Sequence, residues 1–577
     1  MLGVWGRTHK SIIASFDQGA VKSFCSQGSG SIGQKLLAMA GTLDNRLALC
    51  KALQISYHRC TTDENLIVQA YARWSDRCCE YLLGSYSFVV WDSRSSKLFC
   101  ARDPVGSVPF YYSLTSDHFV FGTSIKAVLS AEPVSDELDE RFVRTRLEND
   151  RYIDSERTFY KAVRKLPPGH TLSVTPDSVQ IQRYWFPESL PKRSFSSDDE
   201  CASAFIELLT TVVEEQLPSK AKVGAHLTGG LDSSTVAAVA SRVLRGRGHN
   251  LASAYCWLPP PLDKPLSAEH NLIEQVRGQL SIKQHFQKVA ATDTTYGLAQ
   301  DLTLLPAAEM LFQERPVMQQ AQKDGIQVLL SGWGGDELIS FNGRGYYANL
   351  FRSRQWRRLW KESQDTSNEP IKHIFHQGIA SQYPLVMQAY KSVKRRRKHK
   401  LIKHYLNPDF LRQVKPYEQK PLRYLNTRQT QLDLLANGHL AERMEAWAEM
   451  GKRYGFIYRY PLLDKRIVEF ALCLPPEMFR RGKWNRWIMR TAAAKLLPAD
   501  VAWNPDKRDP VRMAPLKAAL KESFIQIGKQ LSERTVNPSR AQYLDMPRLL
   551  SDLNADSLAN QTSDLGKISH ALLFLDF

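Results

Sequence analysis

The sequence predicts an α/β protein in two parts, the first rich in strands and the second built on a parallel sheet and followed by helices. Short β-branched and aromatic runs, separated by turn residues, fill much of the first third of the chain. After about residue 200, strand-like runs alternate with amphipathic helical runs. The length of 577 residues is also too great for one compact core. We therefore expect two or three domains.

The first part, residues 1–186, contains strand-like runs at close spacing. They are YSFVVWD at 86–92, KLFCARD at 97–103, VPFYYSL at 108–114, HFVFGTS at 118–124 and HTLSVTPDSVQIQRYW at 170–185. Gly28, Gly30 and Gly33 satisfy the pattern GxGxxG, but their surroundings are not a clear βαβ unit, which favours a flexible turn. The polar stretch 187–200 is predicted to be a linker.

The second part, residues 201–577, starts with strands and helices in alternation. Predicted helices are ECASAFIELLTTVVEEQL, SSTVAAVASRVLRG and AEHNLIEQVRGQL, and predicted strands are KVGAHL, NLASAYCWL and IQVLLSG. Such alternation is typical of a parallel sheet with right-handed crossovers. The chain from about 343 onward is predicted to be helical and to include an insertion at about 343–430.

The loop that follows the strand KVGAHL has the composition of a phosphate-binding turn. Gly229 and Gly230 allow close approach of a ligand, while Thr228, Ser233 and Ser234 add hydroxyl donors. Asp232 would repel a bare phosphate, so it is predicted to bind the Mg²⁺ that accompanies a nucleotide. Because the loop has no lysine, it suits the grip of a leaving pyrophosphate better than transfer of a γ-phosphoryl group.

A second loop strengthens this interpretation. In VLLSGWGGDEL, a buried strand again ends in a Ser- and Gly-rich turn followed by an acid, Asp336. Carboxylates from two strand-end loops can hold Mg²⁺ over a triphosphate. Asp232 and Asp336 are therefore the candidate metal ligands.

The two loops, LTGGLDSS and LSGWGGDE, resemble those of the asparagine-synthetase-like family of pyrophosphatase-loop amide synthetases. The resemblance extends over nearly the whole chain. TTDENLIVQAY, GSYSFVVWD, ARDPVGSVPFYY, FGTSIKAVL and RKLPPGH are similar to the glutaminase half of that family, and YPLLDKRIVEFALCLP and LPADVAWNPDK to the end of its synthetase half. The resemblance implies a degenerate Ntn-hydrolase (glutaminase-like, α/β/β/α) domain and then a doubly wound parallel-sheet synthetase domain.

The resemblance also implies the roles of particular residues. Arg486 stands in GKWNRWIMR where the family often has a lysine that contacts phosphate, and Lys507 matches a lysine that stabilises developing charge. Both are candidate catalytic residues. The expected cofactors are ATP and Mg²⁺. The expected ATP site comprises Leu227, Thr228, Gly229, Gly230, Asp232, Ser233, Ser234, Ser331, Gly332 and Arg486, with Trp333, Gly334 and Gly335 next to the substrate.

The chain departs from the family at the glutaminase nucleophile. That nucleophile is a cysteine at the mature N-terminus, whereas position 2 here is Leu2 and the nearest cysteine is Cys25. An aliphatic side chain cannot attack an amide, so we expect no glutaminase activity. The amine must then come from another source, as in the β-lactam synthetases and lasso-peptide cyclases of this family.

Trp333 favours the lasso-peptide cyclases among these relatives. At this position asparagine synthetases carry glutamate and β-lactam synthetases tyrosine, whereas tryptophan has only an N–H donor and relays no proton. The implied function is a peptide macrolactam (isopeptide) synthetase, which activates an Asp or Glu side chain for attack by the peptide's N-terminal amine. Glu442 is the candidate proton acceptor for that amine, although a salt-bridged helix surface explains it equally well.

Other interpretations stay open. A small-molecule lactam or amide synthetase, an ammonia-dependent asparagine synthetase and a non-catalytic or nucleic-acid-binding protein are the alternatives, the last suggested by a net charge of +18. The basic run 391–403 could guide a peptide or partner, or form a solvated helix surface; no nucleic-acid signature accompanies it. The expected partners are a precursor peptide, a leader-binding protein and a leader protease. Scattered cysteines, and the lack of a signal peptide or membrane span, indicate a cytoplasmic protein.

Overall fold

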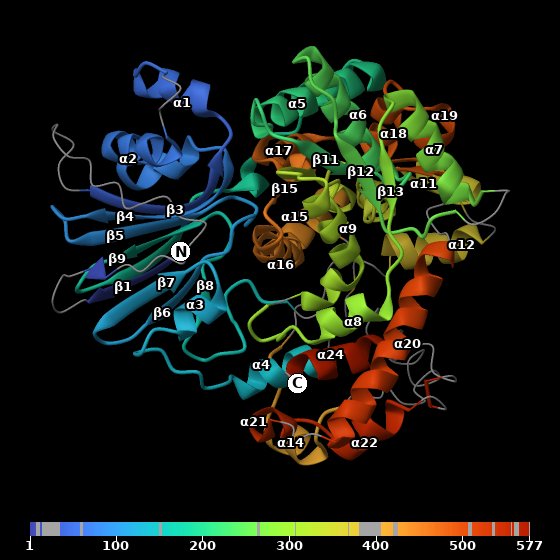
Figure 1. Cartoon of the computed structure of the whole chain (residues 1–577). Helices are drawn as coiled ribbons and strands as arrows, with labels where there is room; N and C mark the ends of the chain where they lie inside the picture. Colours follow the sequence, from blue (N-terminus) through green and yellow to red (C-terminus); the bar gives the residue numbers. More distant parts are fainter. Residues whose placement is uncertain are drawn as a thin grey trace.

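A computed structural model describes most of the chain (Figure 1). The described residues are 1–6, 12–13, 35–57, 62–148, 153–261, 266–305, 307–366, 369–379, 383, 405–418, 425–505, 510–533, 537–554, 557–558 and 565–575. Lys507, the pattern Gly28-x-Gly30-x-x-Gly33 and the basic run 391–403 lie outside these residues. Within the described residues, no helix is both long and apolar enough to cross a membrane.

The first domain contains two five-stranded antiparallel sheets. One has the order β2-β1-β7-β6-β8, formed by Ile12–Ile13, Leu2–Gly6, His118–Gly122, Tyr111–Leu114 and Arg164–Lys165. The other has the order β10-β9-β5-β4-β3, formed by Val179–Arg183, His170–Val174, Lys97–Arg102, Gly84–Asp92 and Lys35–Leu43. The predicted strand runs of the first part therefore form these sheets.

These sheets lie face to face between helices (Figure 1). α1 (Arg46–Leu53) and α2 (Asp63–Trp74) cover the sheet that contains β4, and α3 (Ile125–Leu129) packs against the sheet that contains β6 and β7. Because both faces of β4 are covered, six consecutive residues of this strand are buried and its sequence is apolar instead of alternating. Helices thus cover the outer faces of the two sheets.

The second domain is built on a five-stranded parallel sheet. Its order is β13-β12-β11-β14-β15, formed by Gln284–Phe286, Ser253–Cys256, Val223–His226, Val328–Leu330 and Ile457–Arg459. The chain leaves the central strand β11 first toward one edge and then toward the other, so the sheet is doubly wound. The reversal lies between β11 and β14, where open sheets of this kind bind ligands beyond their carboxyl ends.

Helices cover both faces of this sheet. α5 (Asp198–Gln216) and α6 (Leu231–Gly246) lie on one side, and α9 (Leu311–Lys323) and α16 (His439–Arg453) on the other (Figure 1). The other longer helices are α4 (Glu140–Glu148), α7 (Ala268–Leu280), α8 (Ala291–Leu298), α15 (Thr427–Ala436), α17 (Lys465–Cys473), α18 (Trp487–Ala493), α20 (Pro510–Glu533), α22 (Met546–Asp552) and α24 (Leu565–Leu575). Within the insertion, the described helices include α10 (Tyr346–Arg352), α11 (Trp356–Thr366), α12 (Pro370–His373) and α14 (Pro408–Gln413).

Two details of the second part differ from the sequence prediction. The linker predicted at 187–200 ends earlier, because α5 begins at Asp198 and the Ser197 hydroxyl accepts the Glu200 N–H as its N-cap. The acids at the end of the predicted linker form the first helical turn, where the helix dipole favours them. The sheet is also flanked by β13 and β15, which the sequence does not predict; each has only three residues.

Candidate active site

The first predicted loop leaves β11 and enters α6 at the switch point of the sheet. Gly229 has a φ of +69°, a left-handed conformation that favours glycine. The hydroxyls of Thr228 and Ser233 lie 3.0 Å apart, and the Thr228 N–H donates to Ser233 Oγ over 3.2 Å. The loop therefore bends back on itself and presents the amino end of α6 above the strands.

The second predicted loop, Ser331–Asp336, packs directly against the first. A Cβ on Gly332 would lie 2.6 Å from the Ser233 nitrogen, and one on Gly335 would lie 2.9 Å from Asp232 Cγ. Only glycine permits this approach. The fold thus brings together the two loops, which are about a hundred residues apart in the sequence.

Arg486 joins the two acids of these loops. Its Nη1 lies 3.5 Å from Asp232 Oδ2, makes an ion pair with Asp336 Oδ1 and lies 3.4 Å from Ser340 Oγ. The backbone of Arg486 is left-handed, with φ +57°, a conformation that costs a non-glycine residue about 1–2 kcal/mol. This residue precedes α18, in which burial lowers the pKa of Arg490 to about 10, helped by the Arg486 charge. The second domain therefore concentrates positive charge beside its two acids.

The arrangement fits a magnesium-bound nucleotide. Two carboxylates close to one guanidinium nitrogen supply the oxygen ligands that Mg²⁺ prefers. The Ser234 hydroxyl, buried at the start of α6, has no hydrogen-bond partner among the described residues. Within the same residues, no group of three or more His, Cys, Asp or Glu could hold a metal by itself. Mg²⁺ is usually bound by one or two carboxylates together with phosphate oxygens of the substrate, and Asp232 and Asp336 suit a metal held in this way.

Trp333, at the centre of the second loop, lies against α16. The Arg443 guanidinium is 3.8 Å from the centre of the Trp333 ring and 4.2 Å from the centre of the Trp447 ring. The His439 ring meets Trp333 edge-on at 6.3 Å. Arg443 and Trp333 are both half-buried, and a cation on an aromatic face at such a site is stabilised by about 1 kcal/mol, so this stack helps to tie the loop to the helix.

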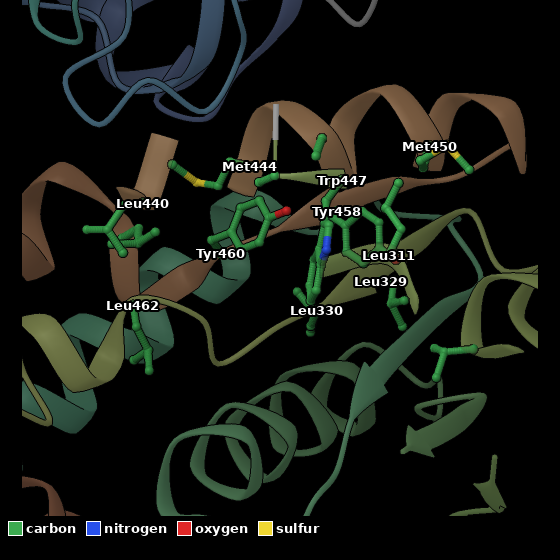
Figure 2. Packing of buried hydrophobic residues seen from close by; sticks show 14 of the residues in the cluster. Leu311, Leu329, Leu330, Leu440, Met444, Trp447, Met450, Tyr458, Tyr460 and Leu462 are labelled. Carbon is green, nitrogen blue, oxygen red and sulfur yellow. The ribbon is translucent and has the colours of Figure 1, made fainter. Parts of the chain in front are cut away.

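Aromatic side chains continue from Trp447 along the carboxyl ends of the strands. Figure 2 shows Trp447, Tyr458 and Tyr460 side by side, and the Trp447 and Tyr458 rings are 4.8 Å apart. Beneath them the buried Glu314 carboxylate accepts hydrogen bonds from Tyr458 Oη at 2.6 Å and Trp257 Nε1 at 2.8 Å, and lies 3.0 Å from His226 Nε2. The sequence prediction missed this cluster.

Glu442 lies elsewhere than its predicted role requires. Its two carboxylate oxygens face cations of the first domain, with Arg146 Nη1 at 3.5 Å and Lys165 Nζ at 3.8 Å. A base must offer a free lone pair to the substrate amine, and these ion pairs engage both oxygens. The role of Glu442 as proton acceptor stays a prediction that this geometry does not favour. The alternative, a salt-bridged helix surface, is right about the ion pairs but not about the surface, because Glu442 is buried and its partners lie in the first domain. The predicted role of Lys507 concerns a residue outside the described ranges.

In the first domain, the described cysteines are buried thiols. They are Cys50, Cys78, Cys79 and Cys100. Burial raises the pKa of Cys79 and of Cys100 well above its usual value, which suppresses the reactive thiolate. None of these four cysteines is therefore suited to act as a glutaminase nucleophile.

Comparison with known protein families agrees with the two-domain order of the fold. The asparagine synthase family matches residues 204–571, and the glutamine amidotransferase domain matches residues 21–185. These matches define an ATP-dependent carbon–nitrogen ligase with an amidotransferase-type first domain. The chain belongs to the asparagine synthase family and is an asparagine-synthase-like, amide-forming enzyme. This family uses ATP, usually with Mg²⁺.

Individual relatives are distant. The glutamine-hydrolysing asparagine synthetase 3 of Bacillus subtilis is 27% identical over 482 residues, which cover 80% of this chain and 73% of that protein. Asparagine synthetase 1 of the same organism is 21% identical over 555 residues, covering 93% and 84%. The amidase chry2 of Gibberella zeae is 26% identical over 298 residues, covering 48% of this chain and 42% of that protein.

Proposed function

We propose that this enzyme is an ATP-dependent peptide macrolactam synthetase of the kind found in lasso-peptide biosynthesis. It would adenylate an Asp or Glu side chain of a precursor peptide and let the peptide's N-terminal amine displace AMP. The observation that supports this best is Trp333, which sets an indole stacked on Arg443 where asparagine synthetases carry glutamate. A site without that carboxylate suits an amine that the substrate itself delivers.

The first domain gives separate support for a substrate-borne amine. Its four described cysteines are buried, with the thiol pKa raised in Cys79 and Cys100, so we propose that it releases no ammonia from glutamine. The match to the glutamine amidotransferase domain favours glutaminase activity instead, so a measurement of that activity tests this part of the proposal directly. Intact-mass measurement after incubation with a diazo-ketone analogue of glutamine should show no adduct, and glutamine should yield no glutamate; one adduct per chain would refute this part of the proposal.

The residues of the two loops would perform the first step. Bound Mg·ATP supplies an electrophilic α-phosphorus and a pyrophosphate leaving group. Asp232 and Asp336 would hold the metal, while Thr228, Ser233 and the amides that open α6 would bind phosphate oxygens. A substrate carboxylate oxygen forms the new bond to phosphorus as the bond to pyrophosphate breaks, and Arg486 offsets the charge that leaves.

The second step depends on position more than on charge. The amine nitrogen bonds to the acyl carbon, the bond to AMP breaks and the amine proton passes to solvent or to a base. Holding both ends of one peptide in place makes this attack intramolecular, which lowers the barrier by several kcal/mol. Trp333 and its aromatic neighbours would exclude water, which would otherwise hydrolyse the activated acid.

The test is AMP release from Mg·ATP with three substrates in parallel. These are a peptide with a free N-terminal amine and an internal acid, aspartate with ammonia, and short amino-carboxylates, each with Asp232→Asn as the inactive control. AMP release with the peptide alone, with a product lighter by one water, is the expected result. Release with the small substrates alone would replace the proposal by a small-molecule lactam or asparagine synthetase. A precursor-type peptide should be offered with leader-binding and protease partners as well.

A further inference from the structure

A buried charged cluster joins the two domains. It consists of Arg102, Tyr111, Arg146 and Lys165 from the first domain and Glu442 and Glu445 from α16, and we call it the interface cluster. All six residues are at least nine-tenths buried. Charges this deep are costly unless they are paired and hydrogen-bonded, so the geometry of the cluster is tightly determined.

Glu445 is the centre of the interface cluster. Arg102 Nη2 lies 2.6 Å from Glu445 Oε1, the Tyr111 hydroxyl donates to Oε2 over 2.8 Å, and Lys165 Nζ is 3.8 Å away. Burial by itself would raise the pKa of Glu445, but Lys165, Arg102 and the Tyr111 hydrogen bond lower it below its usual value. The carboxylate is therefore ionised and fixed.

Arg102 is fixed in turn by the first domain. Its guanidinium donates to the carbonyl oxygens of Val108, Gly106 and Leu166, each over 2.9 Å. The position of Glu445 is thus set by a network in the first domain, and not by packing within α16 alone.

The neighbouring face of α16 contacts the second loop. Arg443 lies between the Trp333 and Trp447 rings, and successive residues of a helix are about 100° apart around its axis. Rotation of α16 would therefore shift Glu442, Glu445 and Arg443 together. Holding the two glutamates in the interface cluster holds Arg443 on Trp333.

Arg459 makes a second connection of the same kind. Its side chain lies 3.0 Å from Asp44 Oδ1 and donates to Thr42 Oγ1 over 2.5 Å, and both partners belong to the first domain. Its main-chain carbonyl accepts the N–H of Ser331 over 2.9 Å, where the second loop begins. The first domain therefore reaches the start of this loop through one residue, Arg459, and its centre through two residues of α16, Glu445 and Arg443.

We propose that the first domain is a positioning scaffold for the synthetase site, acting through the interface cluster and Arg443 on the loop Ser331–Asp336. Glu445 and Arg443 are positioning residues in this scheme. The proposal goes beyond the proposed function and does not depend on the identity of the substrate, because it concerns the loop itself.

Hydrogen–deuterium exchange of the full-length protein tests it without substrate. In Glu445→Gln and in Arg443→Met, amides in peptides covering 331–338 should exchange about ten-fold faster than in the wild type, because local opening of the loop becomes easier. Tyr111→Phe, which removes only one hydrogen bond, should produce a smaller acceleration in the same peptides. The double variant Glu445→Gln/Arg443→Met should exchange no faster than the faster single variant, because both changes act through one connection.

The insertion provides a closely matched control. Glu362 in α11 is also a buried carboxylate that accepts from a tyrosine, Tyr346 at 2.6 Å, and from an arginine, Arg358 at 3.0 Å. Glu362→Gln and Tyr346→Phe should leave exchange of 331–338 unchanged. Wild-type exchange there in a folded Glu445→Gln variant, or single-variant effects that multiply in the double variant, would overturn the proposal. If Glu445→Gln does not fold, wild-type exchange in Tyr111→Phe would overturn it.

Discussion

At the scale of single residues, Arg486 explains how two carboxylates can lie beside each other in one site. Its guanidinium contacts both Asp232 and Asp336, so their mutual repulsion is offset within the protein. In the proposed reaction the same cation would offset the charge of the pyrophosphate that leaves. One side chain can thus serve acids and phosphate in succession.

Replacing one of these acids should separate metal-dependent from metal-independent binding. Asp232→Asn should weaken Mg·ATP binding about ten-fold, because one metal ligand loses its charge. In the presence of a chelator, metal-free ATP should bind to this variant at least as tightly as to the wild type. Calorimetric titration measures both affinities. Asp198→Asn is the control, because Asp198 is an acid that pairs with Arg481, outside the loops. Equal Mg·ATP affinity in Asp232→Asn and wild type would contradict the metal assignment.

The site residues whose positions the sequence predicts are those that neighbouring residues in the chain identify. Asp232 and Asp336 each follow a strand and glycines, so the sequence indicates both a place and a task. Glu442 shows the limit of such reasoning. A helical pattern predicts how side chains are spaced along a helix, but not which element packs against each face of that helix. For Glu442 one partner is Arg146, which lies nearly 300 residues earlier in the chain.

At the scale of elements, the second loop depends on glycine for a steric reason. Gly334 has a φ of +87°, and a Cβ there would lie 2.3 Å from Leu463 Cγ. Gly334→Ala should therefore destabilise the protein by about 2–3 kcal/mol or displace the loop, with loss of AMP formation. A thermal melt and the AMP assay measure the two effects.

Gly325 serves as a control for Gly334, because a side chain there would meet backbone strain but no steric clash. Its φ is +66°, but a Cβ added at this residue would have no neighbouring atom within 4 Å, so Gly325→Ala should cost only about 1 kcal/mol and spare activity. An equal effect of the two substitutions would show that the contact with Leu463 is unimportant.

The sequence predicts helices and strands correctly where they are long enough to show a periodic pattern of apolar residues. The nine residues of β4 and the nineteen of α5 carry clear patterns. β15 has three residues and is recognised only through its pairing with β14. This short strand nevertheless carries Arg459, which contacts the first domain, and it is followed by Tyr460. A strand that is difficult to predict from the sequence therefore contributes directly to the contact between the domains.

At the scale of the whole molecule, the contact between Asp44 and Arg459 makes stability depend on pH. Burial raises the pKa of Asp44 to about 7, although Arg459 partly opposes this. The folded state then holds a proton that the unfolded state releases near pH 4, so this contribution to stability is complete in acid and is lost as the pH rises to about 7. The loss is at most about 1.4 kcal/mol per pH unit.

Asp44→Asn removes this titration. The melting temperature of the wild type relative to that of Asp44→Asn should therefore fall between pH 5 and pH 7 and become constant above. Thermal melts of both proteins across that range provide the measurement. A difference that does not change with pH would show that Asp44 is ionised throughout.

Domain order was predictable because each domain carries its own motifs in sequence. The fit between the domains was not, since it depends on residues such as Arg102 and Lys165 that a single sequence gives no reason to pair with α16.

The interface cluster also limits how this protein can change over evolutionary time. Whatever chemistry the first domain performs, deleting it would remove the cations that fix Glu442 and Glu445 and would expose to water the apolar surface of α16 that the interface now covers. A gene that lost this segment would have to acquire compensating substitutions in α16 at the same time. We therefore expect exchange of the first domain by recombination to preserve folding only when the new domain keeps partners for Glu442 and Glu445.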